Sequence, residues 1–220
     1  MSQLERRGKA LEHLVACSLK HVYNWSLVVE NYPMIFERQK TKHTDHRPKI
    51  GLNEIDVLAI NQRGDNVNLS KVLAPHTDDE ILEVNVKDWL TSTLTPSGLS
   101  DIINNFRLCE PRITENFPKS RIRRLLVAYD ISKPGLEKLL DEQPQIDVLC
   151  TLEKRGFKSF GTQKYRGRVG DVEEDLLEPL IGTIKGFFDN KVYPSWGSLG
   201  MDLLRIYVYF ELMGDTRADS

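Results

Sequence analysis

Residues 82–90, LEVNVKDWL, carry polar side chains at alternate positions of an otherwise apolar run. Glu83, Asn85 and Lys87 would therefore share one face of a strand. Carboxylate and amide oxygens are ligands that suit a hard cation such as Mg²⁺. An ammonium beside them can orient water or offset charge that develops on a phosphate. This stretch predicts a site for metal-assisted hydrolysis of a phosphodiester bond.

Two other parts of the chain would bring carboxylates to the same site. Asp56 interrupts the apolar stretch GLNEIDVLAI, residues 51–60, where a carboxylate without a partner would be costly. Glu12 lies on an amphipathic helix that apolar residues at helical spacing predict over residues 4–22. Because paired strands lie about 5 Å apart, we expect Asp56 to meet the first stretch at the end of a sheet, with Glu12 reaching in from the helix.

The elements that must position these residues follow a simple order along the chain. Strands are predicted over 26–31, 53–61 and 80–87, then a helix over 95–110, a strand over 123–131, a helix over 133–143 and a strand over 145–153. A strand, a crossover helix and a second strand favour parallel pairing. We therefore expect an α/β fold, in which a mixed central sheet is flanked by helices and the strands 53–61, 80–87 and 123–131 are central.

The chain is expected to divide into a core domain, residues 1–153, and a C-terminal extension, residues 154–220. Residues 154–170 are basic and contain glycine, which predicts a linker or an exposed loop. Beyond them, 175–193 and 199–214 are apolar enough to predict a mainly helical extension that packs on the sheet or on another subunit.

The order of these motifs resembles the PD-(D/E)xK nuclease superfamily, and within it the Mrr-type restriction endonucleases and archaeal Holliday-junction resolvases. The resemblance covers roughly residues 4–153. The residues that match the family's helix, acidic strand and lysine are Gly8, Glu12, Glu54, Asp56 and Lys87. The family normally has an acidic residue two positions before the lysine, and this chain has Asn85 there. An amide oxygen can still bind a cation but supplies no negative charge.

The resemblance implies a restriction-endonuclease-like αβββαβ core and an endodeoxyribonuclease that depends on Mg²⁺ or Mn²⁺. Asp56 and Asn85 would hold the ion, helped by the backbone carbonyl of residue 86. Lys87 would position the attacking water, and Glu12 would act as an outer ligand. Glu83 is a further candidate metal ligand, because it adds the charge that Asn85 lacks.

Two other functions remain open. The chain is either a nuclease fold retained for DNA binding or assembly, with Asn85 marking lost catalysis, or a structural protein that binds a partner through its C-terminal helices. Binding of a divalent ion would separate the nuclease from both alternatives. Salt-dependent DNA binding would separate the second function from the third.

The net charge of −2 does not by itself indicate a nucleic-acid-binding protein, but the basic residues are clustered. Phosphate backbones attract Lys and Arg without requiring a positive total charge. We expect two loops that flank the site, residues 37–49 and 119–124, to contact DNA phosphates. The residues concerned are Arg38, Lys40, Lys42, Arg47, Arg121, Arg123 and Arg124.

The remaining expectations concern location and assembly. No tract is long enough to span a membrane, and the charged first residues are unlike a secretory signal, so a cytoplasmic protein without a membrane partner is expected. Cys17, Cys109 and Cys150 lie far apart, mostly among apolar residues, which predicts core thiols in a reducing compartment. Cleavage of both DNA strands needs two sites, so a homodimer built with residues 175–214 is expected.

Overall fold

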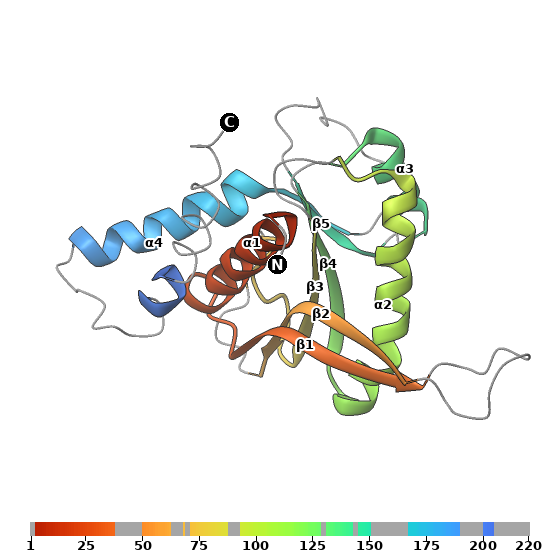
Figure 1. Cartoon of the computed structure of the whole chain (residues 1–220). Helices are drawn as coiled ribbons and strands as arrows, with labels where there is room; N and C mark the ends of the chain where they lie inside the picture. Colours follow the sequence, from red (N-terminus) through yellow and green to blue (C-terminus); the bar gives the residue numbers. More distant parts are fainter. Residues whose placement is uncertain are drawn as a thin grey trace, which may run out of the picture.

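A mixed six-stranded sheet with helices on both faces forms the body of the protein (Figure 1). The computed structural model describes residues 3–37, 50–62, 68, 71–87, 93–128, 131–142, 145–150, 167–189 and 200–204. In chain order the elements are α1 (Gln3–His21), β1 (Leu27–Glu37), β2 (Ile50–Asn61), β3 (Glu80–Lys87), α2 (Pro96–Asn116), β4 (Arg121–Ala128), α3 (Lys133–Glu142), β5 (Asp147–Cys150), β6 (Val169–Asp171), the π-helical turn η2 (Glu173–Leu177) and α4 (Glu178–Asp189). The predicted α/β class with a mixed sheet is confirmed.

The direction of the strands changes halfway across the sheet, in which β1 to β6 lie in sequence order. β1, β2 and β3 pair antiparallel, whereas β3, β4, β5 and β6 pair parallel. A parallel pair needs a crossover connection, and α2 and α3 lie within the first two crossovers. The parallel pairing expected for the strand–helix–strand unit β4–α3–β5 is confirmed.

The predicted elements agree with the structure except near the end of the sheet. β3 has the expected bounds, while β1 and α2 run several residues further than their patterns indicated. β6 begins inside the stretch 154–170 expected to be a linker or loop, so that prediction is wrong for residues 169 and 170. A strand of three residues carries too little alternation to be recognised.

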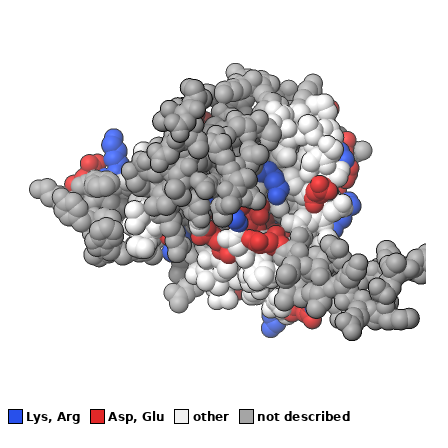
Figure 2. All heavy atoms as spheres, viewed as in Figure 1, with Lys and Arg blue, Asp and Glu red and all other residues white. Residues whose placement is uncertain are grey.

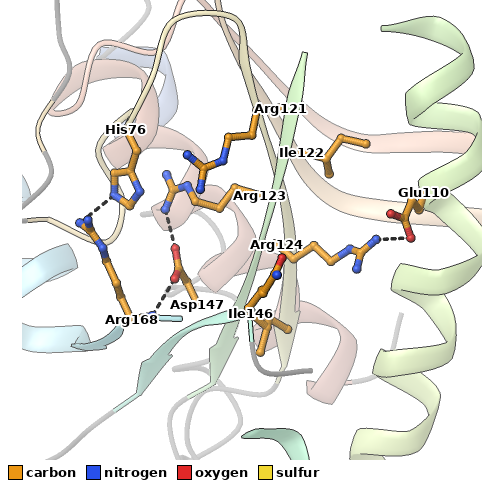
Figure 3. Close-up of a pocket in the computed structure, with 10 residues that line it drawn as sticks. His76, Glu110, Arg121, Ile122, Arg123, Arg124, Ile146, Asp147 and Arg168 are labelled. Carbon is orange, nitrogen blue, oxygen red and sulfur yellow. Dashed lines mark hydrogen bonds and ion pairs between the residues drawn. The ribbon is translucent and has the colours of Figure 1, made fainter. Parts of the chain in front are cut away.

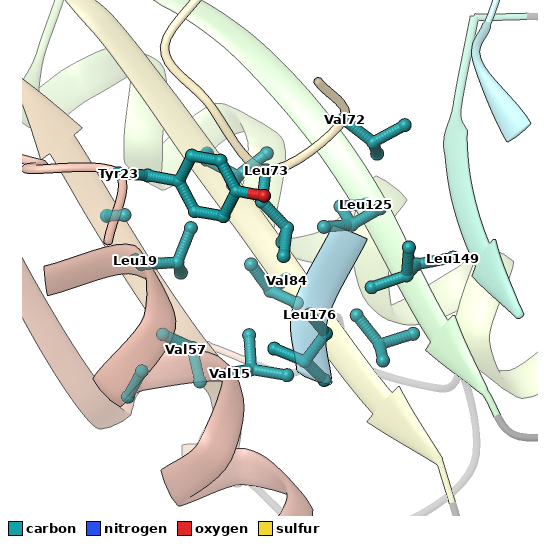
Figure 4. Packing of buried hydrophobic residues seen from close by; sticks show 14 of the residues in the cluster. Val15, Leu19, Tyr23, Val57, Val72, Leu73, Val84, Leu125, Leu149 and Leu176 are labelled. Atoms are coloured by element: carbon teal, nitrogen blue, oxygen red, sulfur yellow. The ribbon is translucent and has the colours of Figure 1, made fainter. Parts of the chain in front are cut away.

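The larger part of the core lies beneath α1. Figure 4 shows Val15 and Leu19 of α1 against Val57, Val84 and Leu125 of three neighbouring strands. The helical spacing of the α1 residues and the alternation of the strand residues bring one apolar stripe onto one apolar face. This packing fixes α1, and with it Glu12, across the antiparallel half of the sheet.

α2 and α3 cover the opposite face of the sheet (Figure 1). Phe106 of α2 and Leu139 of α3 pack with Leu126 of β4 and Val148 of β5. Both faces of the parallel strands are therefore buried, which explains why β4 and β5 read as nearly continuous apolar runs.

Residues 167–189 belong to the same packed body as the core. β6 extends the sheet beside β5, and Leu176 joins the cluster beneath α1. Leu180 packs with Leu14 and Cys17 of α1, so α4 lies alongside that helix (Figure 1). Of the two arrangements expected for the extension, residues 167–189 adopt packing on the chain's own core; the division at residue 153 stays a prediction.

Two smaller expectations can be compared with the structure. Cys17, Cys109 and Cys150 are buried and free, which confirms them as core thiols. Burial raises the pKa of the Cys17 and Cys109 thiols to about 12, so both stay protonated and unreactive at neutral pH. No helix within the described ranges is long and apolar enough to cross a membrane.

The first prediction tests whether residues 167–189 contribute to the stability of the whole chain. Leu176→Ala leaves a cavity in the main core and should lower the free energy of unfolding by about 2–5 kcal/mol. Ile181→Ala removes an exposed apolar side chain of α4 and should change it by less than about 0.5 kcal/mol. Urea denaturation of both variants measures the difference. Equal effects would contradict the packing described above.

Candidate functional site

β2 and β3 separate at the point where the predicted site lies. Their pairing runs from Asn61 opposite Glu80 to Val57 opposite Val84, while β2 continues beside β1 as far as Ile50. We call this point the fork. There the Asp56 carboxylate accepts a hydrogen bond at 2.6 Å from the backbone N–H of residue 86. The Asp56 carboxylate thus accepts a hydrogen bond that a backbone carbonyl of a paired strand would otherwise accept, at the point where the pairing of β2 and β3 ends.

A residue in the left-handed conformation changes which side chains of β1 point toward α1 beside the fork. Asn31 has a φ of 52°, a conformation that asparagine tolerates better than most residues. Neighbouring residues of a regular strand point to opposite faces. Here Glu30 pairs with His13 and the next side chain, Asn31, accepts a hydrogen bond from Lys9. Both partners are on α1, so two successive side chains of β1 point to the same face.

β2 shows the same shift opposite Asn31. Ile55 packs in the cluster beneath α2, whereas Val57 packs beneath α1. Residues two apart on a strand normally share a face. Asp56 lies at this change, and its charge acts on Glu12 of α1 and on Cys109 of α2. One irregular position therefore brings the carboxylates of a strand and a helix together.

Glu12 is buried and paired with an ammonium of its own helix. Lys9 Nζ lies 2.7 Å from Glu12 Oε2 and 3.5 Å from Glu54 Oε1. Burial is the main cause that raises the pKa of Glu12, with Asp56 adding to it and Lys9 opposing it. Burial acts to lower the pKa of Lys9, but the two glutamates outweigh it and the pKa is raised. Lys9 therefore stays charged at neutral pH between the two carboxylates.

The Asp56 carboxyl is also placed where its charge is disfavoured. Burial raises its pKa, and Glu54 adds to the rise. The charges of Lys87 and Lys9 and the N–H bond at the fork oppose this. The structure thus brings Glu12, Asp56 and Lys87 within electrostatic reach of one another. Two partly desolvated carboxylates beside a lysine are groups that an added cation would stabilise.

Asn85 lies on the α2 side of β3, because Val84 and Val86 on either side of it pack beneath α1. Its ligation of an ion together with Asp56 stays a prediction. Asn85 is buried, and its Oδ1 has no hydrogen-bond partner in the described part of the chain.

Glu83 lies in a separate cluster beneath α2. Burial raises its pKa to about 8, with Arg124 opposing the rise. Arg124 Nε is 3.6 Å from Glu83 Oε2, but Arg124 Nη2 is closer to Glu110, at 2.6 Å from its Oε2. A carboxyl that is mostly protonated at neutral pH is a poor metal ligand. The expectation that Glu83 adds negative charge at a metal site stays a prediction, and its raised pKa weighs against it.

The fork fits a weakly held ion rather than a closed metal cage. Within the described ranges, no group of three or more His, Cys, Asp or Glu is arranged to hold a metal. Mg²⁺ is commonly held by only one or two carboxylates together with water and substrate phosphates. Glu12 and Asp56 meet that minimal requirement, because both are buried enough for a cation to relieve their unfavourable charge.

Three of the basic residues expected near the site lie at the other end of the sheet. Arg121, Arg123 and Arg124 lie on β4 rather than in a loop. Arg121 stands opposite Glu80 at the start of β3, whereas Lys87 ends that strand. The expectation that these arginines flank the site is therefore wrong. The other four, Arg38, Lys40, Lys42 and Arg47, lie outside the described residues.

Arg123 is committed to internal contacts and is not available to a phosphate. Its side chain is only 5% exposed, and a buried guanidinium needs partners for its N–H groups. It donates to two carboxylates and two backbone carbonyls from three other segments. These acceptors are Glu80 Oε1 (3.0 Å), Asp147 Oδ2 (2.8 Å), Val72 O (2.6 Å) and Ala74 O (2.8 Å).

Sequence reasoning missed two residues that shape the fork. Lys9 lies three residues before Glu12 on a helix, a spacing that places two side chains on one face, so this contact carried a readable signal. The left-handed conformation of Asn31 carried none, because asparagine occurs in strands and turns alike. Comparison with known proteins adds no further residue, because no protein-family model, curated protein or solved structure matches the chain.

The second prediction concerns the pH dependence of stability. Because the pKa of Glu83 is about 8 in the folded protein and near 4.5 ordinarily, the folded state holds a proton that the unfolded state loses. The contribution of Glu83 to stability is present below about pH 4.5 and lost as pH rises to about 8. Glu83→Gln should therefore gain stability relative to the wild type across this range.

Urea denaturation at pH 5, 6, 7 and 8 measures this difference. Glu115→Gln is the matched control, because Glu115 is an exposed glutamate on α2. The control should keep the pH dependence of the wild type. Parallel stability curves for Glu83→Gln and the wild type would show that Glu83 is ionised in the folded protein.

Proposed function

We propose that the chain is a divalent-cation-dependent endodeoxyribonuclease whose site is the fork between β2 and β3. One observation carries this proposal: Glu12, Asp56 and Lys87 come from three separate motifs, and the charges of Glu12 and Lys87 both act on Asp56. The order of α1, three antiparallel strands and a parallel fourth strand is also the order that the resemblance to PD-(D/E)xK nucleases implies.

Asp56 and Glu12 would hold Mg²⁺ or Mn²⁺. The bound ion would polarise a phosphoryl oxygen and lower the pKa of a water molecule. Asp56 is suited to this role because the N–H bond at the fork fixes one of its oxygens. The Lys87 ammonium would orient water and offset negative charge on the phosphate. We leave Asn85 out of the ligand set, because its side chain points toward α2.

DNA would approach along the antiparallel half of the sheet. Beyond the fork, β1 and β2 continue as a pair toward residues 38–49, whose Lys and Arg residues we propose as phosphate contacts. Figure 2 shows carboxylate side chains, with a few basic ones beside them, near the centre of the visible face. Contacts between these Lys and Arg residues and DNA phosphates would make DNA binding weaken as the salt concentration rises.

Cleavage of both DNA strands would need two copies of this site, so we also propose a homodimer. Part of the segment expected to form the interface packs on the chain's own core. Ile181, Met201 and Leu204 of that segment are exposed and would be available to a second copy.

A nuclease fold that binds DNA without cutting it is the second candidate, and Lys9 favours it. The Lys9 ammonium contacts Glu12 and lies near Glu54, so part of the negative charge that would attract an ion is already neutralised. If no divalent ion displaces Lys9 from this position, catalysis is absent.

The third prediction tests cleavage on plasmid, branched and single-stranded DNA with Mg²⁺ and Mn²⁺. Asp56→Ala should abolish metal-dependent cleavage. Lys87→Ala should keep metal binding and lower the rate by about 10²–10³, as loss of a charge-stabilising group does elsewhere. Lys185→Ala, at an exposed position on α4, should cut as the wild type does. Cleavage that survives Asp56→Ala would place the activity elsewhere.

The fourth prediction separates the two candidate functions by metal binding alone. Lys9→Met removes the internal cation while keeping much of the side chain's length, so it should tighten Mn²⁺ binding several-fold in calorimetric titrations without DNA. Lys20→Met, on the same helix but paired with Asp202, should bind as the wild type does. If neither the wild type nor Lys9→Met binds Mn²⁺, the non-catalytic candidate is the correct one.

A further inference from the structure

A second polar site lies at the end of the sheet away from the fork. It is a pocket of about 420 Å³ where β4 and β5 begin, and Figure 3 shows the side chains that line it. β3 runs from Glu80 beside this end to Lys87 at the fork, a span of about 23 Å at roughly 3.3 Å per residue. The pocket is therefore separate from the proposed nuclease site.

Arginine dominates the lining of this pocket. Arg121 and Arg123 project from one side of β4, toward His76 and Arg168, whereas Arg124 projects from the other side toward Glu110 (Figure 3). Guanidinium groups match phosphate and carboxylate geometry through paired N–H donors. A recessed site lined by several of them is suited to an anion.

The arginines differ in how far internal partners occupy them. Arg123 is held by Glu80 and Asp147, and Arg124 by Glu110. Arg121 is exposed, and its guanidinium makes no hydrogen bond or ion pair with any other described residue. Arg121 therefore offers the pocket donors that the fold itself does not use.

The charges on the Arg121 side of the pocket do not cancel. Three guanidinium groups, from Arg121, Arg123 and Arg168, face the two carboxylates of Asp147 and Glu80. Burial, Arg123 and Arg168 all lower the pKa of His76, so its ring is neutral at pH 7. Among these groups one positive charge is left over, which attracts an anion into the recess. The exposed Asp79 lies beside Arg121 at its edge.

The hydrogen bonds of His76 indicate how a bound anion would be accommodated in the pocket. Its Nε2 lies 3.1 Å from the backbone oxygen of Lys71 and 3.1 Å from Arg168 Nη1. The first contact requires Nε2 to donate a proton and the second requires it to accept one, so no single tautomer satisfies both. An anion beside Arg168 would accept from that arginine and leave His76 free to donate to Lys71.

We propose that this pocket binds a small phosphorylated molecule, with Arg121 as the principal phosphate donor and Arg168 beside it. Its volume is in the range of small-ligand sites. A DNA duplex fits less well, because internal carboxylates hold Arg123 and Arg124 and leave few donors along the strand for a row of phosphates. The site is independent of the nuclease proposal.

Titration with inorganic phosphate and with ribose 5-phosphate tests this, using calorimetry and phosphorus NMR on the full chain at low salt. We expect saturable binding of both and none of unphosphorylated ribose. Arg121→Gln should weaken binding at least tenfold. Lys119→Gln is the matched control: it removes an exposed cation two residues away that does not line the pocket, and should change binding less than twofold.

Three results would overturn the proposal. The first is absence of saturable binding of either phosphate by the wild type. The second is equal weakening by Arg121→Gln and Lys119→Gln, which would reduce the effect to general charge. The third is Arg121-dependent displacement of phosphate by a short DNA duplex, which would assign the phosphate to a DNA surface. Binding that persists in Asp56→Ala supports the pocket even if the chain cuts no DNA.

Discussion

The parallel half of the sheet depends on the buried guanidinium of Arg123. A charge at this depth is stable only when its N–H groups have acceptors, and removing one partner of such a group typically costs about 3–5 kcal/mol. Glu80, Asp147 and the carbonyls of Val72 and Ala74 come from three segments. Their joint requirement fixes where β3, β4 and β5 begin relative to one another.

The two ends of β3 consequently have different characters. At its start, ion pairs close the sheet and leave one arginine, Arg121, facing a pocket. At its end, β2 departs with β1, and Asp56 occupies the opening by accepting the N–H that a strand would have paired. At the first end, ion pairs hold the strands together. At the second end, the charges of Glu12, Asp56 and Lys87 are only partly balanced by one another. Binding of an ion or a phosphate is therefore expected at the ends of the strands rather than along the faces of the sheet.

The fold was largely predictable because its signals are periodic. Helical spacing in α1 and alternation in β3 fix which side chains are buried, and the strand–helix–strand unit fixes parallel pairing. β6 was not predictable, because a strand of three residues has no period to detect and is held by β5 and Val72, Leu149 and Asp175 around Gly170.

The candidate site was predictable in composition but not in arrangement. Sequence patterns identified Glu12, Asp56 and Lys87, but the change of facing at Asn31, which affects how the strand carboxylate meets the helix, is not visible in a run of residue types. The same limit applies to RIRR in β4. The sequence RIRR shows a basic cluster, but the hydrogen-bond acceptors around it determine that Arg123 is buried while Arg121 is exposed to solvent.

At the left-handed Asn31, the alternation of side chains along the paired strands β1 and β2 changes by one residue. On one side of it, β1 and β2 present one set of side chains to α1; on the other side, they present the alternate set. A single position therefore allows the two strands to contribute to two hydrophobic clusters, beneath α1 and beneath α2, while the register of their pairing stays the same on both sides of it. Which face of β1 and β2 points toward α1 beyond the fork therefore has only two possible settings. One backbone angle selects between them, rather than the sum of the side-chain contacts.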